Sequence, residues 1–211
     1  MSPAILSAAA MFGFVTSITP GPNNMMLLAS GLNFGVRRTV PHMLGVSIGY
    51  VVLMLAVGFG LGEAVGAVPG AFLALKIAGG AYMLWLAWQI ARSAPPRGVE
   101  SEHGLASPAA SPGRRPMSFL GAVAFQWVNP KAWVIVVTAA ATYVAPDEFT
   151  RDLLLVTLVC GLINLPSIGV WALFGASLRR FLADPVWLRR FNVAMAALLV
   201  ASLWPLFAAA I

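Results

Sequence analysis

The sequence predicts an all-α, polytopic membrane protein with six transmembrane helices. Its composition is the first reason: of 211 residues 60% are hydrophobic and 9% are charged, whereas about a quarter of a typical soluble domain is charged. Mean hydropathy is +0.86. The second reason is that most charges fall between apolar runs, each long enough to cross a bilayer. Short segments of alternating polarity, typical of membrane barrels, are not seen.

Six apolar runs are expected to cross the membrane. They are Pro3–Phe34, Thr39–Leu61, Pro69–Ala91, Met117–Ala145, Leu153–Ser177 and Val186–Ala210. Four of them have the length of one tilted span of about 20 residues or slightly more. The first and the fourth are longer, at 32 and 29 residues. That excess predicts discontinuous helices, each made of two half-helices joined by an unwound centre.

A dense helix-breaking cluster interrupts the first run, at Pro20, Gly21, Pro22, Asn23 and Asn24. Proline removes an amide donor and its ring clashes with the preceding turn. In a bilayer the freed backbone groups must bond within the protein or line a wet cavity. The asparagines are candidate N-caps for the following half-helix, whose free amides and positive dipole end suit a carboxylate. The alternative is a proline kink in which the asparagines only satisfy loose backbone groups.

The fourth run contains a second break, formed by Asn129, Pro130 and Lys131. Pro130 suits the first position of a half-helix. Lys131 would then lie near a helix N-terminus, where the dipole disfavours its charge, and an anionic substrate could be its partner. The alternative is a lysine that snorkels toward water. Asn23 and Asn129 are 106 residues apart, about half of the chain.

Each half of the chain therefore contains three spans and begins with a broken one. Residues 1–91 form the first half, 92–116 a proline-rich flexible linker, and 117–211 the second half of a single membrane domain. Because three is an odd number, a repeated unit enters the membrane from the opposite side. The halves are thus a possible 3+3 inverted repeat, a common transporter design with the binding site at the interface between the repeats.

The basic residues predict the orientation. Ten of the 13 Lys and Arg lie in the loops after the first, third and fifth spans, at Arg37, Arg38, Arg92, Arg97, Arg114, Arg115, Arg179, Arg180, Arg189 and Arg190. The opposite side has only Arg151, among acidic residues, and Glu63. By the positive-inside rule these three loops are cytoplasmic and both termini lie outside. The net charge of +6 therefore indicates topology, and no nucleic-acid partner is expected.

Three further polar residues inside spans are candidate substrate contacts: Lys76, Tyr82 and Asn164. Lys76 either faces the interior or snorkels outward. Asn164 either faces a cavity or bonds backbone freed by the nearby Pro166. His42 is expected at the membrane face, as a proton relay or simply as an amphipathic side chain.

Several kinds of site are not visible in the sequence. No span has a central Asp or Glu, and no metal-ligand cluster, nucleophile elbow or phosphate loop is present. We therefore expect no enzyme, no metal and no cofactor. The expected partners are the lipid bilayer and a small-molecule substrate, and a homo-oligomer is possible.

Four ordered motifs resemble the LysE/RhtB family of amino-acid exporters. They are Thr19-Pro-Gly-Pro-Asn23, Gly35-x(9)-Gly45-x(3)-Gly49, Lys76-x(2)-Gly79-x(2)-Tyr82 and Phe125-x(3)-Asn129-Pro-Lys131. The resemblance covers essentially the whole chain. It implies a six-span exporter of amino acids or derivatives in the bacterial inner membrane, driven by the proton gradient. By position it also implies roles for the residues of both breaks, Pro20–Asn23 and Asn129–Lys131.

One departure from the family pattern bears on the substrate. Branches that handle cationic amino acids tend to have an acidic residue after the second glycine of the second span, where this chain has Tyr50. The resemblance thus favours neutral amino acids or their derivatives. We expect the substrate carboxylate at the half-helix N-termini and Lys131, and its ammonium at unwound backbone carbonyls. Both breaks should then line one cavity. The rival hypothesis is a non-transporting membrane scaffold or assembly protein, in which the breaks only shape the bundle.

Overall fold

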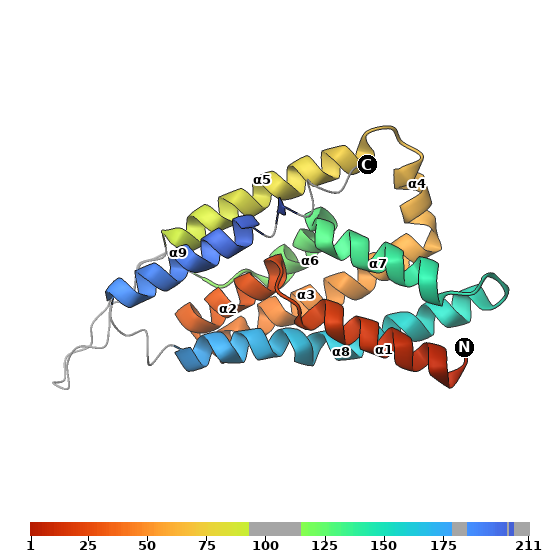
Figure 1. Cartoon of the computed structure of the whole chain (residues 1–211), viewed down its shortest axis with the longest axis horizontal. Coiled ribbons are helices and arrows are strands. Elements are labelled where there is room, and N and C mark those ends of the chain that lie inside the picture. Colours follow the sequence, from red (N-terminus) through yellow and green to blue (C-terminus); the bar gives the residue numbers. More distant parts are fainter. Residues whose placement is uncertain (93–114, 179–184, 202, 205–211) are drawn as a thin grey trace.

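The computed structural model describes residues 1–92, 115–178, 185–201 and 203–204, and the regular structure in these ranges is entirely helical (Figure 1). Most of the predicted linker 92–116 lies outside them. The elements are α1 (Pro3–Ile18), α2 (Pro22–Phe34), α3 (Val36–Ala56), η1 (Val57–Leu61), α4 (Gly62–Gly66), α5 (Ala71–Ala91), α6 (Phe119–Val128), α7 (Pro130–Tyr143), η2 (Pro146–Glu148), α8 (Phe149–Leu178) and α9 (Pro185–Ala201).

The predicted breaks in the first and fourth apolar runs are confirmed. α1 and α2 meet at a bend of 55°, and α6 and α7 at a bend of 70°. Two helical stretches, Val36–Gly66 and Pro146–Leu178, are long and apolar enough to cross a membrane, and each bent pair adds one more candidate. Among the described residues this gives two to four spans, so six spans remain a prediction.

The second predicted span, Thr39–Leu61, needs a correction at both ends. Helix α3 begins at Val36, because Gly35 has a φ of 78° and turns the chain immediately after α2. At the other end the helical path continues to Gly66 through the wider turn η1. Within η1, Gly60 has a φ of 108°, a conformation that favours glycine. This span is therefore kinked near its far end.

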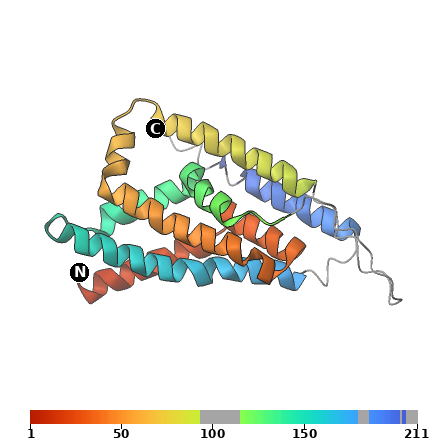
Figure 2. The same cartoon turned by 180° about the vertical axis from the view of Figure 1, so that it is seen from behind.

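The helices interleave the two halves of the chain (Figures 1 and 2). The unbroken helix α3 of the first half packs on α6 of the second half, and the unbroken α8 of the second half packs on α1 and α2 of the first. α5 and α9 pair with each other along one side. Each broken span therefore lies against the long helix of the other half, and the two breaks come into contact.

Glycines allow this close packing. A Cβ on Gly175 of α8 would meet the backbone carbonyl of Leu28 in α2, and one on Gly31 would meet that of Ala172. On α3, a Cβ on Gly49 would lie 2.8 Å from Gln126 Cγ and 2.9 Å from Val123 Cα of α6. Gly45 and Gly49 therefore serve packing between helices of this chain.

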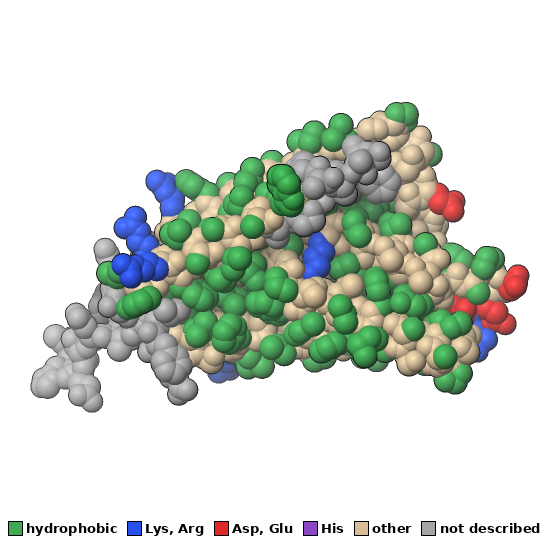
Figure 3. Space-filling view, in the orientation of Figure 1, with side chains coloured by type: hydrophobic (Ala, Val, Ile, Leu, Met, Phe, Trp, Pro, Cys, Tyr) green, Lys and Arg blue, Asp and Glu red, His purple; other side chains and the backbone are tan. Residues whose placement is uncertain are grey.

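The surface separates charge by sign. Lys and Arg gather where α5 ends and α9 begins, and Asp and Glu gather at the opposite end of the long axis (Figure 3). Between the ends, the sides carry many exposed aliphatic and aromatic side chains. Such a broad apolar surface is unusual for a soluble protein and suits contact with lipid.

Candidate functional site

The first break is a short extended segment between the end of α1 at Ile18 and the start of α2 at Pro22. Gly21 is the N-cap of α2, so the prediction that Asn23 or Asn24 caps this helix is wrong. The reason is that Pro22 itself takes the first helical position, for which its fixed φ is suited. Asn24 instead points back and donates to the carbonyls of Ser17 and Thr19, at 2.8 and 2.7 Å.

The backbone carbonyls exposed by this break all have partners. Trp171 Nε1 of α8 donates to Ile18 O at 3.1 Å. Lys131 Nζ of α7 donates to Thr19 O at 3.0 Å and to Pro20 O at 3.1 Å. A break within a bilayer is stable only when such groups are satisfied inside the protein. Side chains of the second half thus complete the backbone of the first.

The second break closes differently. Asn129 is the N-cap of α7, where its Oδ1 accepts from the Lys131 amide at 3.1 Å and its carbonyl accepts from the Ala132 amide at 3.0 Å. Pro130 takes the first helical position, as predicted. The N-terminus of α7 is therefore closed by its own cap, whereas α2 has no side-chain cap. The expectation of two open half-helix ends holds only for α2.

The Lys131 side chain joins the two breaks. Its ammonium contacts three oxygens of the first break: Thr19 O, Thr19 Oγ1 at 3.1 Å, and Pro20 O. We call these three atoms the ammonium site. It lies at the carboxyl end of α1, where the helix dipole is negative and favours a cation. The position of the charge thereby avoids the positive end of α7, to which Lys131 belongs.

Gly21 leaves the space that Lys131 fills. A Cβ on Gly21 would lie 2.8 Å from Lys131 Cδ and 2.9 Å from Lys131 Nζ. Gly21 has a φ of −177°, which any residue can adopt, so the constraint is the neighbouring lysine and not the backbone.

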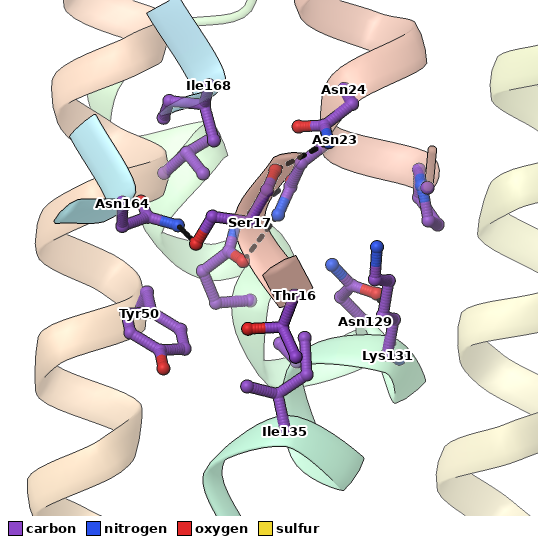
Figure 4. Close-up of a pocket in the computed structure, with 15 residues that line it drawn as sticks. Thr16, Ser17, Asn23, Asn24, Tyr50, Asn129, Lys131, Ile135, Asn164 and Ile168 are labelled. Carbon is purple, nitrogen blue, oxygen red and sulfur yellow. Dashed lines mark hydrogen bonds between the residues drawn. The ribbon is translucent and has the colours of Figure 1, made fainter. Parts of the chain in front are cut away.

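Both breaks line one cavity, as expected from the sequence (Figure 4). Its lining comprises Thr16, Ser17, Gly21, Pro22, Asn23, Asn24, Val46, Tyr50, Gln126, Asn129, Lys131, Ala132, Ile135, Asn164 and Ile168. Asn23 and Gln126 exchange two hydrogen bonds, of 2.9 and 3.2 Å, across the boundary between the halves. The volume is about 40 Å³, counted as space for the centres of water molecules. This is room for a few waters, so the site must widen to admit an amino acid.

Asn164 provides an unused acceptor at the cavity. Its Nδ2 donates to Ser17 Oγ at 3.0 Å, while its Oδ1 is buried without a partner. Of the two alternatives from the sequence, the structure places Asn164 on the cavity. A buried polar atom without a partner is costly unless water or a ligand reaches it, so this oxygen is a natural contact for a bound molecule.

The remaining predicted residues lie elsewhere. Tyr82 packs against Phe125 and Trp85, at ring-centroid distances of 5.2 and 5.4 Å, and does not line the cavity. Lys76 lies in α5, and its side chain is outside the described part of the structure. Pro20 contributes its carbonyl to the ammonium site, and Pro130 only begins α7.

Sequence reasoning missed several residues of the site, among them Thr16, Ser17, Gln126 and Trp171. Gln126 could have been found, because it is a polar residue within an apolar run, three positions before Asn129. Trp171 could not be distinguished from the other aromatic residues, because nothing near it in the sequence indicates that its indole N–H bonds the carbonyl of Ile18.

The first break presents two opposite helix ends within a few residues. The carboxyl end of α1 offers carbonyl oxygens and negative potential, and the uncapped amino end of α2 offers amide groups and positive potential. A zwitterion has the complementary pair of charges. No Asp or Glu is among the described residues that line the cavity, so the site has no anion to pair with a cationic side chain.

The sequence matches the family described as LysE type translocator over residues 14–210. The chain belongs to this family. The translocator is 35% identical over 207 residues to a cysteine/O-acetylserine efflux protein of Klebsiella pneumoniae, covering 95% of each chain. It is 34% identical over 202 residues to the protein of the same name in Escherichia coli K12, covering 95% of this chain and 96% of that one. No solved structure matches the translocator.

Membership confirms the resemblance drawn from the four motifs, and it identifies a multi-pass membrane protein of a transport family. The two breaks of the translocator, the cavity between them and its apolar sides are features that many transporters share.

Proposed function

We propose that this translocator exports a neutral amino acid or a small derivative across the bacterial inner membrane. Cysteine and O-acetylserine are the first candidates, because similar proteins are named for their efflux. The observation that carries the proposal is the Lys131 ammonium, held at the carboxyl end of α1 beside the uncapped amino end of α2, on a cavity lined by both breaks.

The substrate binds through its two charges. Its carboxylate lies between the amides at the start of α2, including those of Asn23 and Asn24, and the Lys131 ammonium. Its own ammonium takes carbonyl oxygens of the unwound segment at Thr19 and Pro20. One helix end contributes roughly 0.3–1 kcal/mol and more when partly buried. Together with a lysine this supports millimolar binding, about −4 kcal/mol.

The lining of the cavity favours a neutral side chain on the substrate. Asn164 Oδ1 is a free acceptor, and Tyr50 supplies a hydroxyl from α3. A thiol or an ester could use these groups. A lysine or arginine side chain would meet no carboxylate among the described lining residues and would face Lys131.

The proposed architecture has six spans: α1–α2, α3 to α4, α5, α6–α7, α8 and α9. Residues 1–91 and 117–211 form two inverted halves, which rock around the site. The packing between the halves supports the inverted arrangement, since α3 of the first half lies on the broken span of the second half, and α8 of the second half lies on that of the first. Coupling to the proton gradient rests on the family resemblance.

The test is transport by the purified protein in lipid vesicles. We expect uptake of labelled cysteine or O-acetylserine that is stimulated by unlabelled substrate inside, with the substrate recovered unchanged. A protein that is folded but moves neither compound would favour the scaffold hypothesis. Chemical conversion of the substrate would indicate an enzyme.

Lys131→Met should abolish this transport, because the carboxylate loses its only cationic partner in the described lining. Lys131→Arg should retain part of it, since the charge stays but the shape of the donor changes. Arg151→Met is the matched control, because it removes an exposed cation that pairs with Glu148 and does not line the cavity. Normal transport by Lys131→Met, in the same amount of protein, would contradict the role of Lys131.

A further inference from the structure

The ammonium of Lys131 occupies the position assigned above to the ammonium of the substrate. A lysine ammonium has three donor hydrogens, and Lys131 Nζ has three oxygen acceptors in the ammonium site at 3.0, 3.1 and 3.1 Å. Its hydrogen-bonding capacity is thus fully used before any substrate arrives. A substrate cannot place its own ammonium there until Lys131 leaves.

We propose that Lys131 is a tethered competitor, which restricts the site to ligands that carry an ammonium and a carboxylate together. The proposal rests on the function proposed above and adds to it a rule of specificity. Binding is an exchange of partners: the substrate ammonium takes the oxygens of Thr19 and Pro20, and the displaced Lys131 ammonium pairs with the substrate carboxylate. No covalent bond changes, and the charge of the cavity stays the same because the substrate is a zwitterion.

A simple amine cannot make this exchange. If it took the ammonium site, the displaced Lys131 would be a second cation beside the first, and no Asp or Glu among the described lining residues could receive it. Two like charges at such short range repel strongly. The amine would have to overcome that repulsion to gain only the contacts that Lys131 already makes.

A simple carboxylate fails for the opposite reason. It could draw Lys131 away, but Pro20 O would then lose its donor, and Thr19 O would keep only that of Asn24 Nδ2. A carbonyl left without a donor inside a membrane protein is unfavourable. Only a ligand that brings both groups leaves every partner satisfied, so the selectivity for α-amino acids follows from the position of one lysine.

The site is placed so that this exchange is possible. Thr19 and Pro20 are exposed, and they lie between Ser17 and Gly21, which both line the cavity, as Lys131 does. The ammonium site therefore lies at the exposed edge of the cavity. Lys131 has a long flexible stem, and Gly21 leaves the space through which that stem passes. The Lys131 side chain can therefore move without a change in the backbone of either break.

The experiment compares three related ligands. Cysteine carries both charged groups, cysteamine lacks the carboxylate, and 3-mercaptopropionate lacks the amino group. Binding to the full chain in lipid nanodiscs is measured by calorimetry under reducing conditions. For the unaltered protein we expect binding of cysteine and none of the other two at tenfold higher concentration.

The deciding variant is Lys131→Met, with Lys131→Gln as a second neutral variant in case the first does not fold. Removal of the competitor should raise the affinity for cysteamine at least tenfold and lower the affinity for cysteine. Arg151→Met should leave all three affinities unchanged. If Lys131 were only a contact for the carboxylate, both neutral variants would bind cysteine less tightly and cysteamine no better, and that result would overturn the competitor.

Failure of the broader function gives a different result. If the unaltered protein transports cysteine while the neutral variants gain no affinity for cysteamine, only the proposal that Lys131 acts as a competitor is wrong. If the unaltered protein neither binds nor transports cysteine or O-acetylserine, the proposed function is wrong and the competitor with it.

Discussion

At the scale of single residues, two buried threonines differ in whether their hydroxyls have partners. Thr39 Oγ1 shares a 2.8 Å hydrogen bond with Ser30 Oγ and donates to Gly35 O at 2.9 Å. Thr157 Oγ1 is buried and has no partner. Valine has nearly the same shape as threonine but no hydroxyl. The two sites therefore allow the value of a buried hydrogen bond to be compared with the cost of an unsatisfied hydroxyl.

We expect Thr157→Val to be neutral or stabilising, because it removes only an unsatisfied polar group. Thr39→Val should lower the free energy of unfolding by about 1–3 kcal/mol, because it also leaves Ser30 without its partner. Unfolding of both variants in detergent, followed by circular dichroism, measures the difference. Equal losses of unfolding free energy in the two variants would show that the Thr157 hydroxyl has a hydrogen-bond partner in the folded protein.

The residues of the site show what a sequence can predict at this scale. The sequence marked Lys131 and the two breaks, because charge and proline are conspicuous in an apolar run. It could not show that Lys131 would bind oxygens of the first break, since this contact joins positions 112 residues apart. For His42 the structure contradicts one of the two alternatives: α3 begins six residues earlier and the imidazole is 1% exposed, so it is not an exposed amphipathic side chain, and the proton relay stays a prediction.

At the scale of elements, the contact between α2 and α8 depends on backbone approaching backbone. A Cβ on Gly175 would meet the carbonyl of Leu28, which belongs to the helix and cannot move alone. On the same helix, a Cβ on Gly169 would lie 3.2 Å from the terminal methyl of Met43, the end of a flexible side chain. These two glycines form a matched pair within α8.

Gly175→Ala should force α8 away from α2 and destabilise the protein by about 1–3 kcal/mol or more. Gly169→Ala should have little effect, because Met43 can move its methyl group. Thermal denaturation in detergent compares the stability of the variants. Cysteine transport reports whether the site, which α2 and α8 help to form, is intact. If Gly175→Ala were as stable and active as the unaltered protein, the α2–α8 contact would be looser than described.

The elements were the part of the fold that the sequence predicted best. Proline and glycine determine the two breaks locally, so both appeared where expected, and the length of the apolar runs identified which spans were broken. The packing of α3 on α6 and of α8 on α2 was not predicted, because periodicity in a uniformly apolar helix does not indicate which face meets which neighbour. The continuation of the second span to Gly66 was missed because the apolar run ends before the charged Glu63, whereas the helix continues past it.

At the scale of the whole molecule, charge divides the long axis into two ends. Arg37 and Arg38 begin the helical path Val36–Gly66, and Glu63 lies near its other end. The 19 residues from Arg38 to Val57, before the kink in η1, correspond to about 29 Å along a helix, close to the roughly 30 Å of bilayer hydrocarbon, and Glu63 lies beyond them. Arg38 and Glu63 should therefore lie on opposite sides of the membrane, and basic residues favour the cytoplasm.

Labelling of single cysteines tests this orientation. The native Cys160 is buried, and Cys160→Ala removes it from the assay. In that background, Glu63→Cys should react with a membrane-impermeant maleimide in intact cells, while Arg38→Cys should react only after permeabilisation. Both positions are exposed in the structure. A lack of reaction therefore indicates that the membrane keeps the reagent away, and not that the cysteine is buried in the protein. The reverse pattern would place both termini in the cytoplasm and turn the site around. Reaction of both positions from outside would contradict a single orientation, and with it the assignment of the arginine-rich end to the side from which an exporter takes its substrate.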